Sequence, residues 1–389
     1  MSSDATRVLF LTTSFPLYAE HWSGVFVYRQ ALAISKCGCS VTVLAPGAPG
    51  AATRETIGPL RIERFRYLPE RAQQIAYGGG IPANLKNKPW LWLGVPAFGL
   101  SLIRAASRLA RDHDLLHAHW SFAGALASLK QVRREKPLAV SFHGSDLARA
   151  DGPYATFARR AARAANLVVV HSDDMHRRAS EIGVPGAKIL QLPHGVDAGE
   201  FTPRKSADGP FRLAAVGRLS SEKGFDLLLR AMSRIETDVE WRLEIAGEGP
   251  LRSELQSMTE ALGLQKRVIW RGALRQSDVK KVLEDADLLL IPSYREGFNV
   301  VALESMAAAT PILGTRVGAL PDLVTEAETG WLVEPGDEEG LARAVERSLA
   351  DRAACHRMGR LGRDRLQKHY SLVTVNEPLV AAYRGLLES

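Results

Sequence analysis

The sequence predicts an α/β protein of two domains, each with a mainly parallel sheet covered by helices. Short apolar runs recur along the chain and alternate with segments of helical spacing, which is the pattern of strands buried on both faces. The second half repeats the strand–helix rhythm of the first. At 389 residues, the chain is longer than one hydrophobic core usually accommodates. Two Rossmann-like domains built from βαβ units are therefore expected.

The first half opens with a strand, a helix over residues 26–35 and a second strand, which form one βαβ unit. The strands predicted for this half are residues 8–11, 41–46, 114–120, 138–146 and 167–172. Residues 47–90 are expected to be irregular. The strands predicted for the second half, each with its following turn, are residues 211–219, 243–250, 268–274 and 286–291.

The domain boundary is expected near residues 199–209, where proline, charged residues, serine and glycine gather. The predicted first domain covers residues 1–199 and the second covers residues 200–368. Residues 369–389 form a predicted helix that follows the completed second domain.

The composition is that of a globular protein, with 46% hydrophobic and 24% charged residues. Cys37, Cys39 and Cys355 form neither a disulfide framework nor a metal-binding pattern, which favours a reducing compartment. The N-terminal residues lead directly into a strand and lack the cleavage region of a signal peptide. We therefore expect a cytoplasmic protein.

The net charge of +7 is unevenly distributed. Residues 1–199 contain 24 basic and 14 acidic residues, a balance of +10, whereas the remainder contains 26 and 29, a balance of −3. This asymmetry indicates either an anionic partner of the first half, such as a membrane surface, or a drift in surface composition. The sequence has no arginine-rich tail and no aromatic–basic alternation, so no nucleic-acid partner is expected.

An apolar stretch at residues 90–103 begins with Trp90 and Trp92 and contains Pro96. It is shorter than the ~18 to 20 residues needed to span a bilayer, and the proline is expected to interrupt it. The neighbouring basic residues are Lys86, Lys88, Arg104, Arg108 and Arg111. Two interpretations stay open: a segment lying in a membrane interface, and a core helix of the first domain.

Carboxylates occur in the turn and the helix that follow the strand at residues 286–291. Glu296 and Gly297 lie in the turn, and Glu304 lies inside the helix. Open α/β sheets bind ligands at this edge, and carboxylates accept hydrogen bonds from sugar hydroxyls. The free amides at the helix start favour an anion. The alternative is that both glutamates are exposed and one caps the helix.

Arg218 and Lys223 lie on either side of a turn that ends in Gly224, just before another helix. Two cations and the free amides of a helix start suit a diphosphate, because arginine offers a planar fork and lysine a mobile point charge. The alternative is a pair of solvated surface charges.

The first half has candidate ligand-binding residues at corresponding places. Ser23 and Gly24 precede a helix, where a glycine lets the backbone approach phosphate, although the three-glycine dinucleotide pattern is absent. His119 and His143 lie toward the carboxyl ends of strands, which are better placed for ligand contact than most histidines. A single histidine is nevertheless more often structural.

These motifs together strongly resemble retaining glycosyltransferases of family 4, over nearly the whole chain. The Glu296 and Glu304 pair lies in the family's Pro-Ser…Glu-Gly-Phe…Glu-Ser-Met-Ala frame, and Arg218 to Gly224 match its Gly-Arg…Glu-Lys-Gly element. The His-Ala-His-Trp and Phe-His-Gly-Ser-Asp segments are similar to members that build bacterial surface polysaccharides. One departure is Ala309, where the family usually has glycine.

The resemblance implies the GT-B architecture: two facing Rossmann-like domains with a cleft between them, and a C-terminal helix returning to the first domain. It implies catalytic roles for His143 and Glu296 near the transferred sugar. Donor-binding roles are implied for Gly24, Arg218, Lys223, Leu274, Gly297, Phe298, Asn299, Val300 and Glu304. Weaker candidates, including acceptor contacts, are Ser23, His119 and Asp146.

The implied reaction transfers a hexose-type sugar, with retention, from a UDP- or GDP-linked donor to an acceptor such as a lipid-linked polysaccharide precursor. No cofactor is expected. No Asp-x-Asp motif lies in a loop suited to a metal, so Arg218, Lys223 and the helix start are expected to neutralise the diphosphate. A lipid-linked acceptor would place the protein peripherally on the inner face of the plasma membrane.

Other activities stay open. One is transfer to a soluble acceptor, and another is epimerisation of a sugar nucleotide on the same fold. A phosphorylase would need a lysine in a recognisable pyridoxal phosphate frame, and none is found. A catalytically silent nucleotide-sugar-binding subunit would be expected to have lost a charged site residue, whereas Arg218, Lys223, Glu296, Glu304 and His143 are all present.

Overall fold

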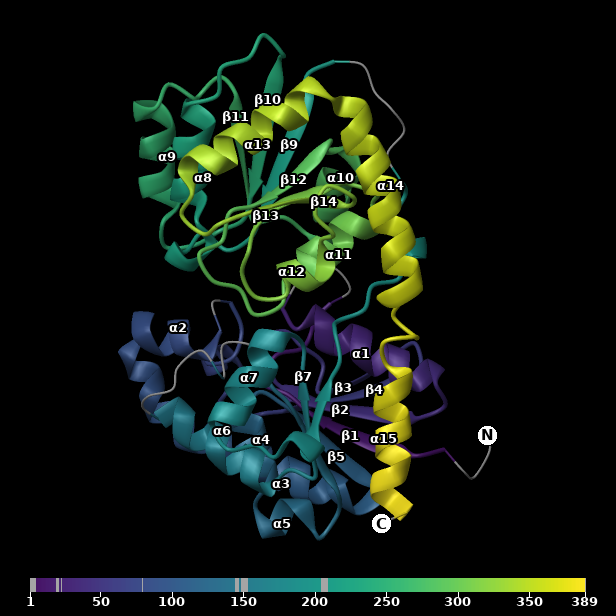
Figure 1. Ribbon diagram of the computed structural model, residues 1–389. Coiled ribbons are helices and arrows are strands. Elements are labelled where there is room, and N and C mark those ends of the chain that lie inside the picture. The colour runs from purple at the N-terminus through teal and green to yellow at the C-terminus, as the bar shows by residue number, and fades with distance from the viewer. Residues whose placement is uncertain are drawn as a thin grey trace. The chain divides into compact units, whose positions relative to one another are not determined.

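The computed structural model describes residues 5–18, 21, 23–78, 80–143, 147, 153–203 and 209–388. The chain divides into two compact units: unit 1 comprises Met1–Gly195 and Leu372–Ser389, and unit 2 comprises Val196–Ser371. Each unit contains one mainly parallel sheet with helices on both faces, which confirms the predicted α/β class (Figure 1). Unit 1 was predicted to end at residue 199, and in the structure it ends at Gly195. The C-terminal tail from Leu372 belongs to unit 1.

The sheet of unit 1 has the order β3-β4-β2-β1-β5-β6-β7-β8, and its pairs are parallel except β3–β4. Its strands are β1 (Arg7–Leu11), β2 (Ser40–Pro46), β3 (Arg54–Ile57), β4 (Leu60–Phe65), β5 (Leu115–His119), β6 (Leu138–Ser141), β7 (Leu167–Val170) and β8 (Ile189–Gln191). Strand β1 lies between β2 and β5, so the chain changes direction across the sheet there. Such a switch point is where open α/β sheets bind ligands.

Successive residues of β1 point to opposite faces of this sheet and enter two different hydrophobic cores. Leu9 and Leu11 pack with α3, α4, α6 and α7, whereas Val8 and Phe10 pack with α1 and α15. The helices of unit 1 are α1 (Val25–Lys36), α2 (Ile81–Asn87), α3 (Val95–Leu109), α4 (Ser121–Ala127), α5 (Lys130–Arg133), α6 (Pro153–Ala164), α7 (Asp173–Glu181) and α15 (Glu377–Glu388). Its 3₁₀ turns are η1 (Glu70–Ala72), η2 (Pro89–Gly94), η3 (Ala110–Asp112) and η4 (Gly186–Lys188).

The sheet of unit 2 is parallel throughout, in the order β11-β10-β9-β12-β13-β14. Its strands are β9 (Phe211–Val216), β10 (Trp241–Ala246), β11 (Val268–Gly272), β12 (Leu288–Ile291), β13 (Ile312–Thr315) and β14 (Gly330–Val333). Its helices are η5 (Ala198–Glu200), η6 (Ser221–Lys223), α8 (Phe225–Ser233), α9 (Arg252–Ala261), α10 (Gln276–Asp285), α11 (Val300–Ala307), α12 (Leu320–Leu323), α13 (Glu338–Ala350) and α14 (Arg352–His369). The switch point of this sheet lies between β9 and β12.

Several predicted strand ends were wrong, and the differences place the candidate residues more precisely. Strand β6 ends at Ser141, so His143 lies in the following loop, and β9 ends at Val216, so Arg218 lies in a turn. Residues 47–90, predicted to be irregular, contain the β3–β4 hairpin and α2. Arginine and glutamate residues interrupt the apolar residues of this hairpin, so its strands lack the continuous apolar run that identified the buried strands.

The apolar stretch beginning at Trp90 is also longer than predicted. The elements η2, α3 and η3 run together over Pro89–Asp112, and by length and composition these 24 residues could cross a membrane. Pro96 does not interrupt them, because it occupies the first turn of α3, where its missing N–H has no helical partner to lose. Only 28% of the apolar window is buried. One side of α3, including Phe98 and Leu102, nevertheless enters the core of unit 1.

We predict that α15 is required for the stability of unit 1, because Leu379 and Tyr383 are fully buried in its core. The substitution Leu379→Ala should lower the free energy of unfolding by about 2–5 kcal/mol, as other large-to-small core changes do. The matched control is Leu387→Ala on the same helix, whose side chain is 41% exposed. Denaturant unfolding followed by circular dichroism measures both, and equal effects would show that α15 does not support the core.

Candidate active-site residues in the two units

In unit 2, the candidate residues lie on loops at the carboxyl edge of the parallel sheet. The loop after β9 contains Arg218 and Lys223, and the loop after β12 contains Glu296. Strands β9 and β12 are hydrogen-bonded neighbours, so both loops emerge at the switch point. Leu274, which follows β11 two strands away, is half-buried at the same edge.

The two loops are joined through their backbones. The carbonyl oxygen of Glu222 accepts hydrogen bonds from the amides of Tyr294 and Arg295, at 2.9 and 3.2 Å. Gly224 has φ +65°, and a Cβ there would lie 2.1 Å from the carbonyl oxygen of Pro292. Only glycine permits this close approach, which explains why a glycine ends the turn.

Glu296 is the centre of the hydrogen-bond network in these loops. Its Oε1 atom accepts from Lys223 Nζ at 2.6 Å, from Ser293 Oγ at 2.8 Å and from Asn299 Nδ2 at 2.9 Å. The glutamate side chain is 4% exposed and that of Lys223 26%. A carboxylate held by three donors has a defined orientation, and a partly exposed lysine with further N–H groups can still contact a ligand.

Asn299 has two roles at this site. Its Nδ2 group orients Glu296, while its Oδ1 atom caps α11 by accepting from the amide of Ala302 at 3.2 Å. The predicted contacts Gly297, Phe298 and Val300 adjoin this cap at the start of α11. Gly318, for which the sequence predicted no role in the site, packs closely against this loop. Its φ is +56°, and a Cβ there would lie 2.6 Å from the carbonyl oxygen of Glu296.

Glu304 is set deeper in α11 and is 3% exposed. Its Oε1 atom accepts from Gln276 Nε2, on the first turn of α10, at 2.7 Å. The sequence did not suggest Gln276, because a residue 28 positions away in the chain carries no local motif. Glu304 is therefore a buried, oriented acceptor rather than an exposed surface charge.

Arg218 is exposed, and among the described residues it forms no ion pair with another predicted residue of the site. Its charge affects the carboxyl group of Glu222. Burial raises the pKa of this carboxyl, but hydrogen bonds from its own backbone amide and from Ser220 lower that pKa, and the positive charges of Lys223 and Arg218 lower it further. The net pKa of Glu222 is below its ordinary value. The turn is therefore electropositive, although it contains a glutamate.

In unit 1, five histidines form a row along the carboxyl edge of adjacent strands. His117 and His119 are in β5, and His143, His171 and His194 follow β6, β7 and β8. The rings stack in sequence, with centroid separations of 4.5 Å (His117–His119), 5.3 Å (His119–His143), 5.0 Å (His143–His171) and 4.0 Å (His171–His194). His171 and His194 were not predicted as site residues. His171 directly follows the buried strand β7, the rule that selected His143, whereas His194 lies three residues after β8, which is not fully buried.

Hydrogen bonds fix the orientation of these rings. His117 contacts Tyr383 of α15 through Nδ1 at 2.5 Å and Ser141 through Nε2 at 2.8 Å. The Nδ1 atom of His119 lies 3.1 Å from Nε2 of His143. The Nδ1 atom of His171 lies 2.8 Å from the carbonyl oxygen of Leu192. Because a carbonyl oxygen can only accept a hydrogen bond, Nδ1 carries the proton of the neutral ring and Nε2 does not.

The stacked imidazoles are neutral at physiological pH. Burial lowers the pKa of all five, and repulsion from neighbouring imidazoles lowers it further for every ring except His171. The pKa falls to about 3 for His117 and to about 4 for His171. His143 and His194 are half-buried, whereas the other three rings are buried, so these two can contact a ligand as neutral hydrogen-bonding groups.

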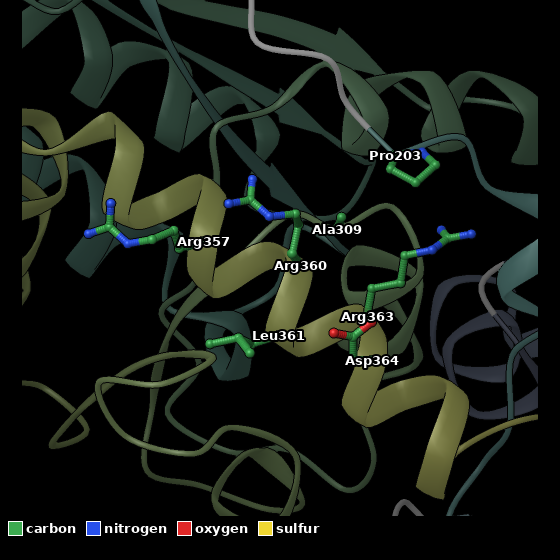
Figure 2. A pocket seen from close by; sticks show the side chains of 7 residues that line it. All are labelled: Pro203, Ala309, Arg357, Arg360, Leu361, Arg363 and Asp364. Atoms are coloured by element: carbon green, nitrogen blue, oxygen red, sulfur yellow. The ribbon is translucent and has the colours of Figure 1, made fainter.

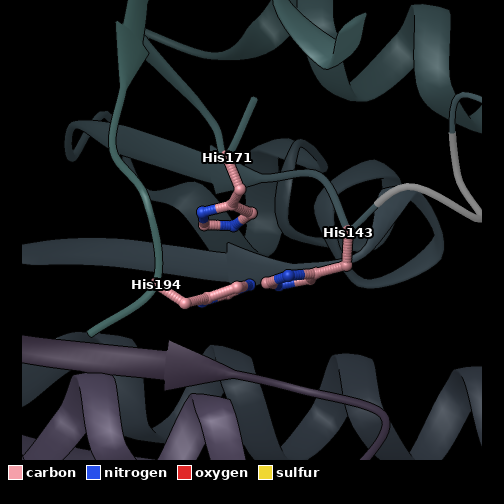
Figure 3. Close-up of side chains that lie close together, drawn as sticks. All are labelled: His143, His171 and His194. Atoms are coloured by element: carbon pink, nitrogen blue, oxygen red, sulfur yellow. The ribbon is translucent and has the colours of Figure 1, made fainter. Parts of the chain in front are cut away.

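Three of the rings come close enough to be considered as metal ligands, because nitrogens of His143, His171 and His194 lie within 4.8 Å of one another. Figure 3 shows His143 and His194 pointing tip to tip, with His171 above them. A metal must lie in the plane of each ligating ring, but the His171 and His194 rings stack at 4.0 Å with planes only 24° apart. An ion cannot lie in both planes, so this arrangement does not suit metal ligation.

The start of α1 adjoins this histidine row. Gly24 has φ +72°, and a Cβ there would lie 2.4 Å from the carbonyl oxygen of Ser14. The hydroxyl of Ser23 is 2.5 Å from that of Ser14. Phe26, in the first turn of α1, packs against His143 with ring centroids 4.7 Å apart. The structure therefore brings these predicted residues together, whereas Asp146 lies outside the described residues.

A hollow of about 500 Å³ in unit 2 is separate from the candidate residues. Figure 2 shows its lining side chains: Pro203, Ala309, Arg357, Arg360, Leu361, Arg363 and Asp364. It lies beyond the carboxyl end of α11, where Arg363 donates to the carbonyl oxygens of Ala307 and Ala198. Glu296 and Asn299 lie at the opposite end of that helix.

Comparisons with known proteins identify the family. Glycogen synthase of Mycobacterium tuberculosis (strain CDC 1551 / Oshkosh) is 31% identical over an alignment of 401 residues, which covers 97% of this chain and 94% of the relative. The chain belongs to glycosyltransferase family 4. The family model "Glycosyltransferase Family 4" matches residues 23–200 of this transferase, and "Glycosyl transferases group 1" matches residues 200–365.

A second relative supports this assignment, and a solved structure supports the fold. WcaL of Escherichia coli (strain K12), a protein named for colanic acid biosynthesis, is 30% identical to the transferase and covers 98% of this chain and 100% of its own. The structure of HepE from Anabaena in complex with UDP and glucose aligns with a TM-score of 0.75 at 18% identity, over 98% of this chain and 100% of that one. The predicted family, α/β fold class and transferase activity are thereby confirmed.

We predict that the histidine row makes unit 1 less stable in mild acid. The unfolded chain binds protons at its histidines below about pH 6.5, whereas in the folded state His171 binds one only near pH 4 and His117 near pH 3. Because the unfolded state gains more protons as the pH falls, the free energy of unfolding should decrease from pH 7.5 to pH 5. Each titrating imidazole should lower the free energy of unfolding by up to about 1.4 kcal/mol for each unit by which the pH falls.

Denaturant unfolding at pH 7.5, 6 and 5 tests this. The substitution His171→Asn keeps a donor toward Leu192 and removes one titrating ring, so the pH slope should become shallower. The control His369→Asn, at an exposed position at the end of α14, leaves all five stacked rings in place and should keep the wild-type slope. A wild-type protein with equal stability at pH 5 and 7.5 would show that the row is protonated in the folded state.

Proposed function

We propose that this family 4 enzyme is a retaining hexosyltransferase that uses a nucleoside diphosphate sugar, UDP- or GDP-linked, bound by unit 2. The observation that carries the proposal is the convergence of Lys223, the buried carboxylate of Glu296 and the start of α11 at one switch point. A cation and free helix amides suit a diphosphate, while oriented carboxylates suit sugar and ribose hydroxyls. The structural similarity to HepE, whose complex contains UDP and glucose, is consistent with this donor class.

In the proposed donor complex, Lys223 uses its remaining N–H groups on the diphosphate while one stays on Glu296. Arg218, which is exposed beside the same turn, adds a second cation. Ser293 and Asn299 also hold Glu296 in this orientation, so the carboxylate can accept from hydroxyls of the transferred sugar. Glu304, oriented by Gln276, is assigned to the ribose.

Retention follows from attack on the same face from which the leaving group departs. The acceptor oxygen forms a bond to the anomeric carbon as the bond to the diphosphate oxygen breaks, and the departing phosphate takes the acceptor's proton. No protein nucleophile is required, and a Glu296 carboxylate stabilised by three donors would be a weak one. Positive charge develops on the sugar in this step. A neutral His143 can hydrogen-bond to the sugar there without opposing that charge.

We assign donor binding to the protein alone, without a metal ion or cofactor. The cations of Lys223 and Arg218, with the amides at the start of α11, provide the electrostatic stabilisation that a metal supplies in other transferases. Lys223 and Arg218, which add to the hydrogen bonds that lower the pKa of Glu222, make this turn electropositive and support the assignment.

The proposed acceptor is a lipid-linked polysaccharide precursor, handled by unit 1 at the cytoplasmic face of the membrane. The similarity to WcaL, named for colanic acid biosynthesis, favours this class. The similarity to a protein named glycogen synthase favours a soluble glycan instead. Incubation of labelled donor with a lipid extract or with oligosaccharides separates the two, according to whether the label enters the organic or the aqueous phase.

The donor proposal predicts that one class of nucleotide sugar will stabilise the protein. A ligand at ~100 times its Kd adds roughly 2.7 kcal/mol, so a thermal-shift screen of UDP- and GDP-linked hexoses should identify the donor. Acceptor-dependent release of the nucleoside diphosphate then shows transfer. Conversion of the donor without acceptor would indicate an epimerase, and stabilisation without any turnover would indicate a silent binding subunit.

The substitution Lys223→Ala should reduce turnover by orders of magnitude, because its charge-assisted contact strengthens as the diphosphate leaves. Lys223→Arg, which keeps the charge, should retain part of the activity. The matched control is Lys266→Ala, an exposed lysine just before β11 and therefore at the opposite edge of the sheet. If Lys223→Ala is folded and as active as the control, Lys223 does not bind the leaving group.

Activity should persist in the presence of EDTA, because the leaving diphosphate is neutralised by side chains and backbone amides. The measurement is the initial rate of sugar transfer with and without chelator, using protein dialysed against EDTA beforehand. Complete loss of activity that manganese restores would contradict the proposal and would require a metal-dependent donor site.

A further inference from the structure

Exposed large apolar side chains are concentrated in one short segment of unit 1. Among the described residues, nine large hydrophobic side chains are strongly exposed, and four of them lie on η2 and α3. These are Trp90 (62% exposed), Trp92 (59%), Leu93 (87%) and Leu100 (54%), which we call the Trp–Leu face. Such a concentration differs from the scattered apolar exposure of an ordinary surface and indicates an interaction site.

The structure fixes this face in place. The opposite side of the same segment contributes Leu91, Phe98, Leu102 and Ala106 to the core of unit 1. Leu93 on η2 and Leu100 and Arg104 on α3 are separated by about two helical turns and then one, so they lie along one exposed stripe. The exposed residues therefore cannot turn inward without unpacking the core, and the face is a permanent feature of the surface.

The segment is also strongly basic. Residues 81–111 contain Lys86, Lys88, Arg104, Arg108 and Arg111 and no acidic residue. Arg108 forms an ion pair with Glu63 at 2.6 Å, and Lys88 donates to the neutral amide oxygen of Gln74. Lys86, Arg104 and Arg111 are exposed. A second copy of the chain would meet this face with the same excess of positive charge, whereas a surface of anionic lipid supplies the complementary charge.

The segment fits a position on a membrane rather than across one. Although 24 residues could cross a bilayer, the buried side of α3 is part of the core of unit 1, and insertion would remove it from that core. Tryptophan side chains favour the headgroup region, where the ring contacts apolar chains while its N–H contacts water. Basic residues beside them favour anionic headgroups.

We propose that the Trp–Leu face, with Lys86, Lys88, Arg104 and Arg111 around it, docks unit 1 on the surface of a membrane rich in anionic lipid. The leucines and tryptophans enter the headgroup region, and the basic residues hold the headgroups. This binding does not depend on the identity of the donor or on catalysis.

The test is co-sedimentation of the full-length protein with vesicles of phosphatidylcholine, with or without 30% phosphatidylglycerol. The wild-type protein should bind the anionic vesicles at low salt, bind phosphatidylcholine vesicles much more weakly, and dissociate at high salt as screening increases. Each of the changes Lys86→Gln, Lys88→Gln and Arg104→Gln should weaken binding by about five-fold.

The apolar contribution is tested with two triple variants. The combination Trp90→Ser, Trp92→Ser and Leu93→Ser should reduce binding at least ten-fold. The matched control, Val239→Ser, Leu361→Ser and Leu387→Ser, removes exposed apolar side chains elsewhere and should bind as the wild type does. Circular dichroism and the thermal shift given by the nucleotide-sugar donor show that each variant is folded, and separate a docking defect from a donor-site defect.

The proposal is overturned if the wild-type protein does not bind anionic vesicles at low salt, or if both triple variants bind equally. It is also overturned if the Trp–Leu face mediates self-association, which sedimentation velocity without lipid would reveal as a concentration-dependent dimer that the first triple variant abolishes.

Discussion

The hydrogen bonding of one carboxylate oxygen organises the candidate donor site. Oε1 of Glu296 accepts from Lys223 on one loop and from Ser293 and Asn299 on another, while the carbonyl of Glu222 accepts two amides between the same loops. The glutamate is almost fully buried, so its charge requires these partners. The loops after β9 and β12 consequently form one rigid structure, and Lys223 and the start of α11 are fixed relative to each other before any ligand binds.

The sequence could single out most of the candidate residues of unit 2 because they lie in local motifs. Parallel strands place the following loops on one edge of the sheet, so Arg218, Lys223 and Glu296 could be grouped without coordinates. The roles of Gln276 and Gly318 escaped prediction because only folding brings these residues against Glu304 and Glu296. The stacking of five histidines escaped for the same reason, since the rings come from β5 and from the loops after β6, β7 and β8, and the order of the strands is not a local property.

The segment around α3 shows a different limit of sequence analysis. A membrane-interface segment and a core helix were treated as alternatives, but the structure places core residues on one side of the helix and exposed apolar residues on the other. Mean apolar character cannot distinguish these cases, because both sides of the helix contribute to it. The proline was misjudged because its effect depends on where the helix begins.

Unit 1 is assembled from the two ends of the chain, and this has a consequence for biosynthesis. The ribosome completes residues 1–195 early, but the residues that close the second face of the sheet, and the Tyr383 hydroxyl beside His117, are made last. Until they emerge, the apolar surface formed by Val8, Phe10 and their neighbours lacks part of its cover. The first unit therefore reaches its final packing only after the whole second unit has been synthesised. During that interval its exposed apolar surface can be bound by chaperones.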